Sequence, residues 1–280
     1  MRTYLASFIR LFFFFNLLAL CLCSSPLPVM AAGEPESYLT AGIGLEQLSY
    51  QEKIPDIDLS SSDSTVTNWV VLLEGQKGIR NFFIGGRAHI PVSDDDTKEH
   101  WTRAGQHEQT NTLSYRWIRA SAYLGYYFHQ LLNPYVGINY GYSEQDRSNF
   151  DNVNNPEVIN RTATEEVDSW SVLFGLGGRF TINTRWSFDY LAEYLLVVDS
   201  ETTNSELPGW KATDVDGYSY SITGRLIYSL AETVSMALQV TGGRLHWDGS
   251  DWEPAGDTRV KWPENDTDFI SGFINIKKTF

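Results

Sequence analysis

The chain of 280 residues is poor in cysteine, in basic residues and in long apolar runs. Its two cysteines, Cys21 and Cys23, lie near the N-terminus, so the remaining sequence offers no disulfide and no thiolate metal ligand. Lysine and arginine number 21 against 35 acidic residues, and the formal net charge is −14. Nucleic-acid binding needs clustered positive charge, so this balance argues against a nucleic-acid partner. After Cys23 no apolar run reaches about 18 residues, and no helical membrane span is predicted.

The apolar run that the sequence does contain stands at its beginning. Arg2 and Arg10 supply positive charge, and residues 11–23 are almost purely apolar. This run is shorter than the roughly 20 residues of a spanning helix, but it matches the hydrophobic region of a secretory signal peptide. We expect cleavage before Ala32.

Cleavage at that point would remove residues 1–31 and leave 32–280 as one domain. Without the two arginines of the signal the formal net charge becomes about −16, from 19 basic and 35 acidic residues. A lipoprotein signal is disfavoured, because Leu20 and Leu22 precede the cysteines where a small residue would be needed.

Alternation of apolar and polar residues is the dominant pattern of the remaining chain. In residues 38–50, Leu39, Ala41 and Ile43 fall on one face and Thr40 falls on the other. The same period of two recurs in 81–91, 118–128, 136–143, 170–182, 186–198, 218–228, 234–242 and 270–280, while 68–75 is apolar on both faces. A period of two predicts β-strands. Runs of about ten residues have the length of a tilted transmembrane strand.

The connections between these strands alternate in length. Short turns are expected at 76–78, 131–133, 183–185 and 231–233, and long polar segments at roughly 52–65, 93–109, 148–164, 200–214 and 249–266. Short turns on one side and long loops on the other are typical of bacterial membrane barrels. Four short and five long connections join ten strands. The sequence therefore predicts an all-β, up-and-down antiparallel barrel of about ten strands that spans a membrane.

The aromatic residues, with nine Trp, 15 Tyr and 15 Phe, sort by their depth along the strands. Those beside short turns or the C-terminus are Phe128, Phe180, Trp186, Tyr228 and Phe280. Those toward the long loops are Trp117, Tyr142, Trp170, Tyr194 and Tyr218. Two aromatic belts at the membrane interfaces would produce this distribution. The alternative, a soluble β-sandwich, would leave the outward apolar rows exposed to water.

The last segment carries a resemblance to a known class. Residues 269–280 end in Phe280, with Ile270, Ile274 and Ile276 on one face, although Lys278 departs from the usual apolar or aromatic choice. The segment resembles the strand by which barrel-assembly machinery recognises its substrates. Together with the signal, it makes the chain resemble small bacterial outer-membrane β-barrel proteins. The resemblance implies an integral outer-membrane location among lipids and lipopolysaccharide, and assembly through the strand that ends at Phe280.

The polar faces of the strands carry charges of both signs. The residues expected in the lumen are Glu46, Glu74, Arg87, His89, Arg119, His129, Arg179, Asp189, Glu193 and Arg225. Because buried charges must be paired, and a ten-stranded barrel is narrow enough for side chains to meet, these residues are expected to form ion pairs. The alternative is a small polar or gated pore. Both interpretations describe a non-enzymatic protein, either a narrow porin-like channel or a structural and surface-interaction barrel.

An enzyme that acts at the rim of the barrel is the other class considered. The chain has the size of omptins, ten-stranded outer-membrane proteases, and Asp94 and Asp96 stand where that family has an acidic pair. The Asp-x-His pair expected after strand seven is missing, since residues 199–201 read Asp-Ser-Glu.

A lipid-modifying barrel would instead use a serine, a histidine and an acid near the rim. His246 and Asp248, with Ser250 close by in sequence, are weak candidates for such a group. The acidic loops lack the twelve-residue calcium pattern, so no metal site and no cofactor are predicted, although divalent ions could bridge loop acids to lipopolysaccharide phosphates.

Overall fold

The computed structural model describes residues 36–61, 64–153, 155–255 and 258–280, and residues 34–280 form one compact unit. The expected signal peptide, residues 1–31, lies outside the described residues. In the described part of the chain no helix is long and apolar enough to cross a membrane.

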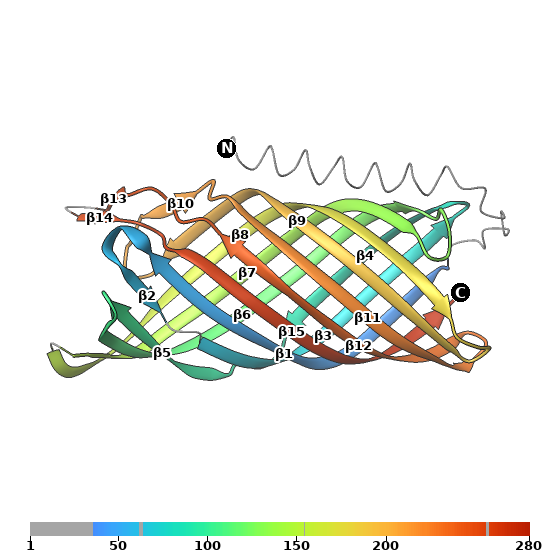
Figure 1. Ribbon diagram of the computed structural model, residues 1–280, viewed down its shortest axis with the longest axis horizontal. Helices are drawn as coiled ribbons and strands as arrows, with labels where there is room; N and C mark the ends of the chain where they lie inside the picture. The colour runs from blue at the N-terminus through green and yellow to red at the C-terminus, as the bar shows by residue number, and fades with distance from the viewer. Residues whose placement is uncertain (1–35, 62–63, 154, 256–257) are drawn as a thin grey trace. The chain divides into compact units, whose positions relative to one another are not determined.

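Ten long antiparallel strands form a closed ring (Figure 1). They are β1 (Tyr38–Ile54), β3 (Ser64–Ile79), β4 (Phe82–Pro91), β6 (Gln106–Tyr126), β7 (Asn133–Asn152), β8 (Asn155–Thr181), β9 (Trp186–Asn204), β11 (Gly217–Ala231), β12 (Val234–Trp247) and β15 (Glu264–Thr279). Each strand pairs with its neighbour in the chain, and β15 pairs with β1 from Tyr38↔Thr279 to Lys53↔Glu264. The predicted ten-stranded up-and-down barrel is confirmed.

The long connections contain short elements of their own. These are η1 (Pro55–Ile57), β2 (Leu59–Ser61), β5 (Asp96–Arg103), β10 (Lys211–Thr213), β13 (Glu253–Ala255) and β14 (Thr258–Val260). We call the end of the barrel with these connections the long-loop end, and the other end the short-turn end. Both described chain ends meet at the short-turn end, where the backbone N–H of Phe280 donates to the Ser37 carbonyl at 3.0 Å.

Strands extend further into the long connections than the sequence indicated. The expected loop at 148–164 is mostly strand, because β7 and β8 stay paired as far as Asn152↔Asn155, and the expected loop at 93–109 contains β5. Above a bilayer both faces of a hairpin can meet water, so the apolar alternation that reveals a membrane strand disappears there although the pairing continues.

One predicted turn was misplaced and one was too short. Residues 76–78 belong to β3, and the chain turns at Arg80 and Asn81, where Arg80 has a φ of 57°. The connection between β6 and β7 covers 127–132 rather than 131–133. The turns predicted around 183–185 and 231–233 are confirmed.

Side chains alternate between a lipid-like exterior and a filled interior. On β1, Leu39 and Ile43 are exposed on the outer face, whereas Thr40 and Glu46 are buried inside. The outward row is equally apolar three strands further round the ring, where Ile222 of β11 is 69% exposed. A continuous band of exposed Leu, Ile and Val is stable against hydrocarbon but not against water.

Aromatic residues flank this band, with one correction. Phe128, Phe180, Trp186 and Phe280 are exposed at the short-turn end and Trp170 is exposed toward the long-loop end, while Tyr142, Tyr194, Tyr218 and Tyr228 are half-buried on the outer face. Trp117 was wrongly placed in the belt, because it lies inside the barrel with an exposure of 5%. It stands two residues from Arg119 on β6 and so shares its inward face.

The interior contains apolar clusters as well as charges. The largest lies toward the long-loop end and includes Leu48, Tyr50, Trp117, Trp247 and Trp262. A smaller one, toward the short-turn end, consists of Phe83, Tyr123, Tyr135 and Leu173, and a third joins Val70, Leu72 and Phe273. Apolar side chains therefore fill part of the lumen at both ends and in its middle.

The outward apolar band makes a depth-dependent prediction. Ile222 lies between Tyr218 and Tyr228 of the two aromatic belts, so Ile222→Arg places a charge near the middle of the bilayer. We expect a loss of about 2–4 kcal/mol in the free energy of unfolding from lipid vesicles, measured by urea titration. The control Leu230→Arg, beyond Tyr228, should lose about 0–1 kcal/mol. Equal losses at both positions would contradict the membrane depth assigned to β11.

Candidate functional site

Two ion pairs cross the bore of the barrel. Arg87 on β4 donates to both carboxylate oxygens of Glu193 on β9, at 3.0 and 2.9 Å. Arg225 on β11 binds Glu74 on β3 through two nitrogens, one of them at 3.2 Å. In each pair the two strands stand four steps apart in the ring of ten. In a ring of ten, the strand directly opposite is five strands away. Partners that are four strands apart therefore face each other almost across the barrel, and their side chains bridge the lumen.

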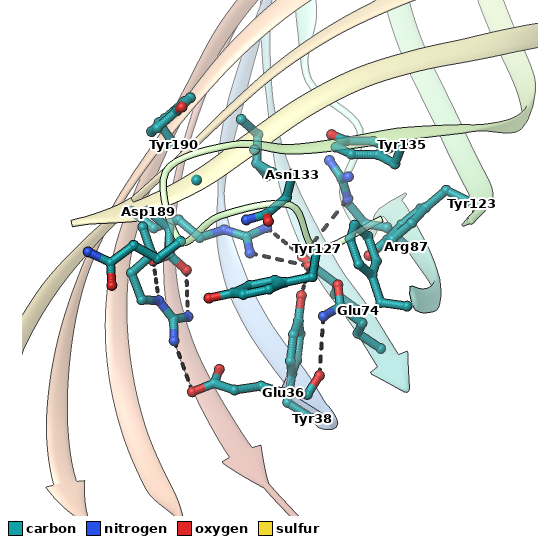
Figure 2. A pocket seen from close by; sticks show the side chains of 18 residues that line it. Glu36, Tyr38, Glu74, Arg87, Tyr123, Tyr127, Asn133, Tyr135, Asp189 and Tyr190 are labelled. Carbon is teal, nitrogen blue, oxygen red and sulfur yellow. Dashed lines mark hydrogen bonds and ion pairs between the residues drawn. The ribbon is translucent and has the colours of Figure 1, made fainter. Parts of the chain in front are cut away.

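Neutral donors and acceptors complete this layer. The Tyr38 hydroxyl donates to Glu74 at 2.6 Å, and the Tyr135 hydroxyl donates to Glu193 at 2.9 Å. Arg225 also donates to the Gln239 side chain at 2.7 Å. Figure 2 shows Tyr38, Glu74, Arg87 and Tyr135 converging from different strands. Since burying a charge without a partner is costly, these contacts are what makes a charged layer tolerable inside a membrane.

A second layer lies closer to the long-loop end. Arg119 of β6 binds Glu46 of β1 and contacts His89 Nδ1 at 3.2 Å. Its guanidinium lies over the Trp117 ring, 4.2 Å from the ring centre, and 5.1 Å from the centre of the Phe269 ring. The second layer therefore combines an ion pair with aromatic packing.

The mouth at the short-turn end carries a third group of charges. Arg179 binds Asp189 at 2.6 and 2.8 Å and Glu36 at 2.9 Å, and Lys277 also binds Glu36. Burial opposes ionisation of Glu36, but Lys277 and Arg179 outweigh it and lower the pKa of Glu36 to about 2. Glu36, which precedes β1, is therefore a carboxylate held between two cations.

These layers divide the interior into separate cavities. The cavity beside the first layer at the short-turn end, about 250 Å³, is the pocket in Figure 2, and its wall includes Tyr38, Tyr123, Tyr127, Tyr135 and Tyr190. The cavity between the first and second layers measures only about 50 Å³, which is room for little more than a water molecule or two. Arg87 forms part of the wall of both cavities, so the ion-pair layer stands between them.

The outer end of the lumen holds a charged group that sequence reasoning missed. Arg147 of β7 binds Glu52 of β1 and Glu99 of β5, each at 2.8 Å. The Trp262 indole N–H donates to Glu165 at 3.0 Å. Glu52, Glu99 and Trp262 lie in segments that were expected to be loops, and Arg147 and Glu165 border another such segment. Continuing the alternation of β1 from Glu46 through Tyr50 would have assigned Glu52 to the same inward face.

The pKa of Glu52 is shifted from its ordinary value. Glu52 lies near the long-loop end of β1, beyond the apolar band. Burial raises the pKa of Glu52 to about 7, and the neighbouring Glu165 and Glu99 act in the same direction while Arg147 opposes them.

Nine of the ten residues expected in the lumen take part in these layers: Glu46, Glu74, Arg87, His89, Arg119, Arg179, Asp189, Glu193 and Arg225. His129 lies elsewhere, because β6 ends at Tyr126 and its alternation stops there. The His129 Nδ1 accepts a hydrogen bond from the Leu131 backbone at 3.2 Å, within the connection to β7.

The weak catalytic candidates are not assembled into a site. Asp94 pairs with Arg116 at 3.1 Å, and Asp96 begins β5 opposite Ser114. Where an omptin has its Asp-x-His pair, residues 199–201 continue β9, and the Ser200 hydroxyl donates to the Val215 carbonyl at 3.0 Å.

The hydrogen bonds that hold His246 and Ser250 join them to other groups rather than to each other. His246 lies on the outward face of β12 between Asp248 at 3.1 Å and Asp266 at 2.8 Å. Ser250 turns away, donating to the Asp251 carbonyl at 2.9 Å and accepting from the Trp262 backbone at 2.8 Å. Among the described residues, no three His, Cys, Asp or Glu side chains are arranged to hold a metal ion.

Comparison with solved structures shows the fold that this site is built on. The outer membrane protease OmpT from Escherichia coli is similar with a TM-score of 0.61 and 10% identity, over 90% of this chain and 99% of that chain. The translocator domain of the autotransporter NalP from Neisseria meningitidis has a TM-score of 0.41 and 10% identity, over 88% and 89% of the two chains. The outer membrane protein OprG from Pseudomonas aeruginosa has a TM-score of 0.36 and 10% identity, over 89% of this chain and 98% of that chain. At this identity the likeness to OmpT concerns the fold alone.

The sequence itself matches one family. No curated protein sequence matches the chain, but the model of the outer membrane protein beta-barrel domain matches residues 17–223, well over half of it. The closed ring of strands, the apolar band and the packed lumen agree with that match. The chain thus belongs to the outer membrane protein beta-barrel domain family and is an integral protein of the outer membrane, surrounded by its lipids and lipopolysaccharide.

Proposed function

We propose that this protein is a barrel with a closed lumen, acting as a structural and surface-interaction protein of the outer membrane rather than as an open diffusion pore. The observation that carries the proposal is the pair of ion pairs, Arg87 with Glu193 and Arg225 with Glu74, that bridge nearly opposite strands. A narrow porin-like channel, the alternative, would require these buried pairs to separate for each passage.

The outer end of the barrel supports a role in surface interaction. Strand β8 runs through 27 residues, far beyond the roughly ten that a membrane crossing needs. Its pairing with β7 continues through most of that length. A paired hairpin that rises above the bilayer is a rigid platform, whereas an unpaired loop of the same length would lose much more entropy when it bound a partner.

We propose that the protein is exported by a signal peptide and then assembled by barrel-assembly machinery that recognises its C-terminal strand. Export would remove residues 1–31 as a signal peptide and leave 32–280 as the barrel domain. The Phe280 side chain is 74% exposed, and its backbone already closes the ring to Ser37. An exposed terminal ring that contributes little packing is available for recognition by barrel-assembly machinery.

A closed lumen predicts that the protein does not conduct ions. Refolded protein, verified by its heat-modifiable gel shift, should show no stable single-channel steps in a planar bilayer at moderate voltage, because the 50 Å³ central cavity cannot pass a hydrated ion. A general diffusion porin inserted in the same bilayer serves as the positive control. Regular, long-lived steps from the folded protein would refute the closed lumen and favour the porin-like channel.

The bridging ion pairs predict an asymmetry in stability. Glu74→Gln leaves Arg225 buried without its carboxylate and should lower the free energy of unfolding from vesicles by about 3–5 kcal/mol. Glu201→Gln, which breaks an exposed pair with Lys211, should cost about 0–1 kcal/mol. Adding Arg225→Met to Glu74→Gln should recover part of the loss, since the unpaired charge is then gone. The interpretation fails if Glu74→Gln proves as mild as Glu201→Gln.

The exposed Phe280 side chain leads to the prediction that its loss impairs assembly in cells without impairing the stability of the folded barrel. Deleting Phe280 should reduce the amount of folded barrel in cells several-fold, while urea-denatured protein refolds into vesicles with nearly normal yield. Phe128→Ala removes another exposed ring at the short-turn end and should affect neither measurement strongly. If the deletion impairs refolding in vesicles equally, Phe280 acts through stability and recognition need not be invoked.

A further inference from the structure

A cavity of about 200 Å³ lies at the long-loop end, and we call it the outer cavity. Its wall is formed by side chains of β1, β5, β6, β7 and β8 and by the segments around Trp210 and Trp262. The wall includes two carboxylates and three indole rings, from Glu52, Glu165, Trp101, Trp210 and Trp262. The outer cavity is separate from the ion-pair layers that bridge the lumen.

The buried charges around the outer cavity do not balance. Glu52, Glu99 and Glu165 are exposed by 2%, 0% and 6% of their surface, and Arg147 by 9%. Arg147 forms ion pairs with Glu52 and Glu99, whereas Glu165 accepts a hydrogen bond from the neutral indole N–H of Trp262. Three carboxylates thus surround one guanidinium.

A second basic residue in the wall does not correct this imbalance. Lys261 lies in the wall of the cavity, but its ammonium binds Asp56 at 2.9 Å. Within the membrane the buried charges balance, because three acids (Glu46, Glu74, Glu193) pair with three bases (Arg87, Arg119, Arg225). Buried carboxylates need positive charge, and at the outer cavity it has to come from a proton or from a ligand.

The aromatic wall indicates which kind of cation fits. Indole faces attract organic cations, and a cage of aromatic rings with a carboxylate is the usual way to hold a quaternary ammonium. Trp210 is only 7% exposed, and its Nε1 has no hydrogen-bond acceptor among the described residues. A buried N–H without an acceptor costs free energy, so it calls for an oxygen on the ligand. A bare metal ion would satisfy neither feature.

We propose that the outer cavity binds a small organic cation, a protonated or quaternary amine that also carries a hydroxyl or carbonyl oxygen, taken from the external side of the outer membrane. Glu52 and Glu165 supply the counter-charge, the indole rings enclose the cationic group, and the Trp210 N–H donates to the oxygen. The proposal goes beyond a closed structural barrel and does not depend on whether the lumen conducts.

The test uses choline chloride as the probe and the whole barrel refolded in an uncharged glucoside detergent. Calorimetry at pH 8 should show saturable binding with one site per barrel. The uncharged isostere 3,3-dimethyl-1-butanol should bind at least tenfold more weakly. Phosphocholine should also bind more weakly than choline, because its phosphate would approach two carboxylates. Equal or tighter binding of phosphocholine would mean that the site takes lipid headgroups rather than free amines.

Variants separate a built site from general attraction to an acidic protein. Glu165→Gln and Glu52→Gln should each weaken choline binding at least tenfold. Glu108→Gln changes a half-buried acid of β6 that is paired with Arg103, and it should leave choline binding unchanged. Affinity should fall between pH 8 and pH 5.5, because protons compete for Glu52, whose pKa is raised to about 7. That pH dependence should be absent in Glu52→Gln.

A further variant keeps the test decisive if a glutamate variant does not fold. Trp210→Phe retains a ring but lacks the N–H, so it should reduce the preference for choline over tetramethylammonium, which has no oxygen. The proposal is overturned if wild-type protein shows no saturable binding, if the neutral isostere binds as well as choline, or if Glu108→Gln weakens binding as much as Glu165→Gln.

Discussion

The hydrogen-bonded seam between β1 and β15 is the constraint on which the rest of the molecule depends. Hydrocarbon offers no partner to a backbone N–H or C=O, so a sheet can cross a bilayer only when it has no free edge. The seam runs from Tyr38↔Thr279 to Lys53↔Glu264 and satisfies the edge of both strands over the whole membrane depth. Closure with ten strands then sets a narrow bore, and every inward side chain must be accommodated inside it.

The narrow bore explains the chemistry of the lumen. A side chain on one wall reaches nearly to the opposite wall, as Arg87 does to Glu193, so inward charges can neutralise one another directly. Tyrosines fill the remaining gaps and satisfy carboxylate lone pairs that the arginines leave free, as Tyr135 does for Glu193. The polar interior required by strand alternation is thereby converted into a largely packed core, which leaves only about 50 Å³ of free space between the two ion-pair layers.

Sequence reasoning succeeded where the bilayer imposes a pattern and failed where it does not. Outward rows such as Leu39 and Ile43 repeat because lipid requires apolar side chains, and they were sufficient to predict the strands and their number. Gly78 suggested a turn by composition, yet the chain continues to Arg80, since turn position depends on register. Glu52 was missed because the outward signal stops above the membrane. Which acid meets which base depends on distances across the ring that no local pattern contains.

The transition above the membrane changes what the interior has to achieve. Between the belts the lumen is the only place for polar groups, and its acids and bases are matched one to one. Beyond the belts water wets the outer face, and the interior becomes the better place for apolar groups such as Tyr50 and Trp262. Buried carboxylates there are no longer forced by alternation against lipid. Glu52, Glu99 and Glu165 outnumber Arg147 in a region where the fold does not require buried carboxylates. This excess negative charge is therefore better explained by ligand binding than by structure.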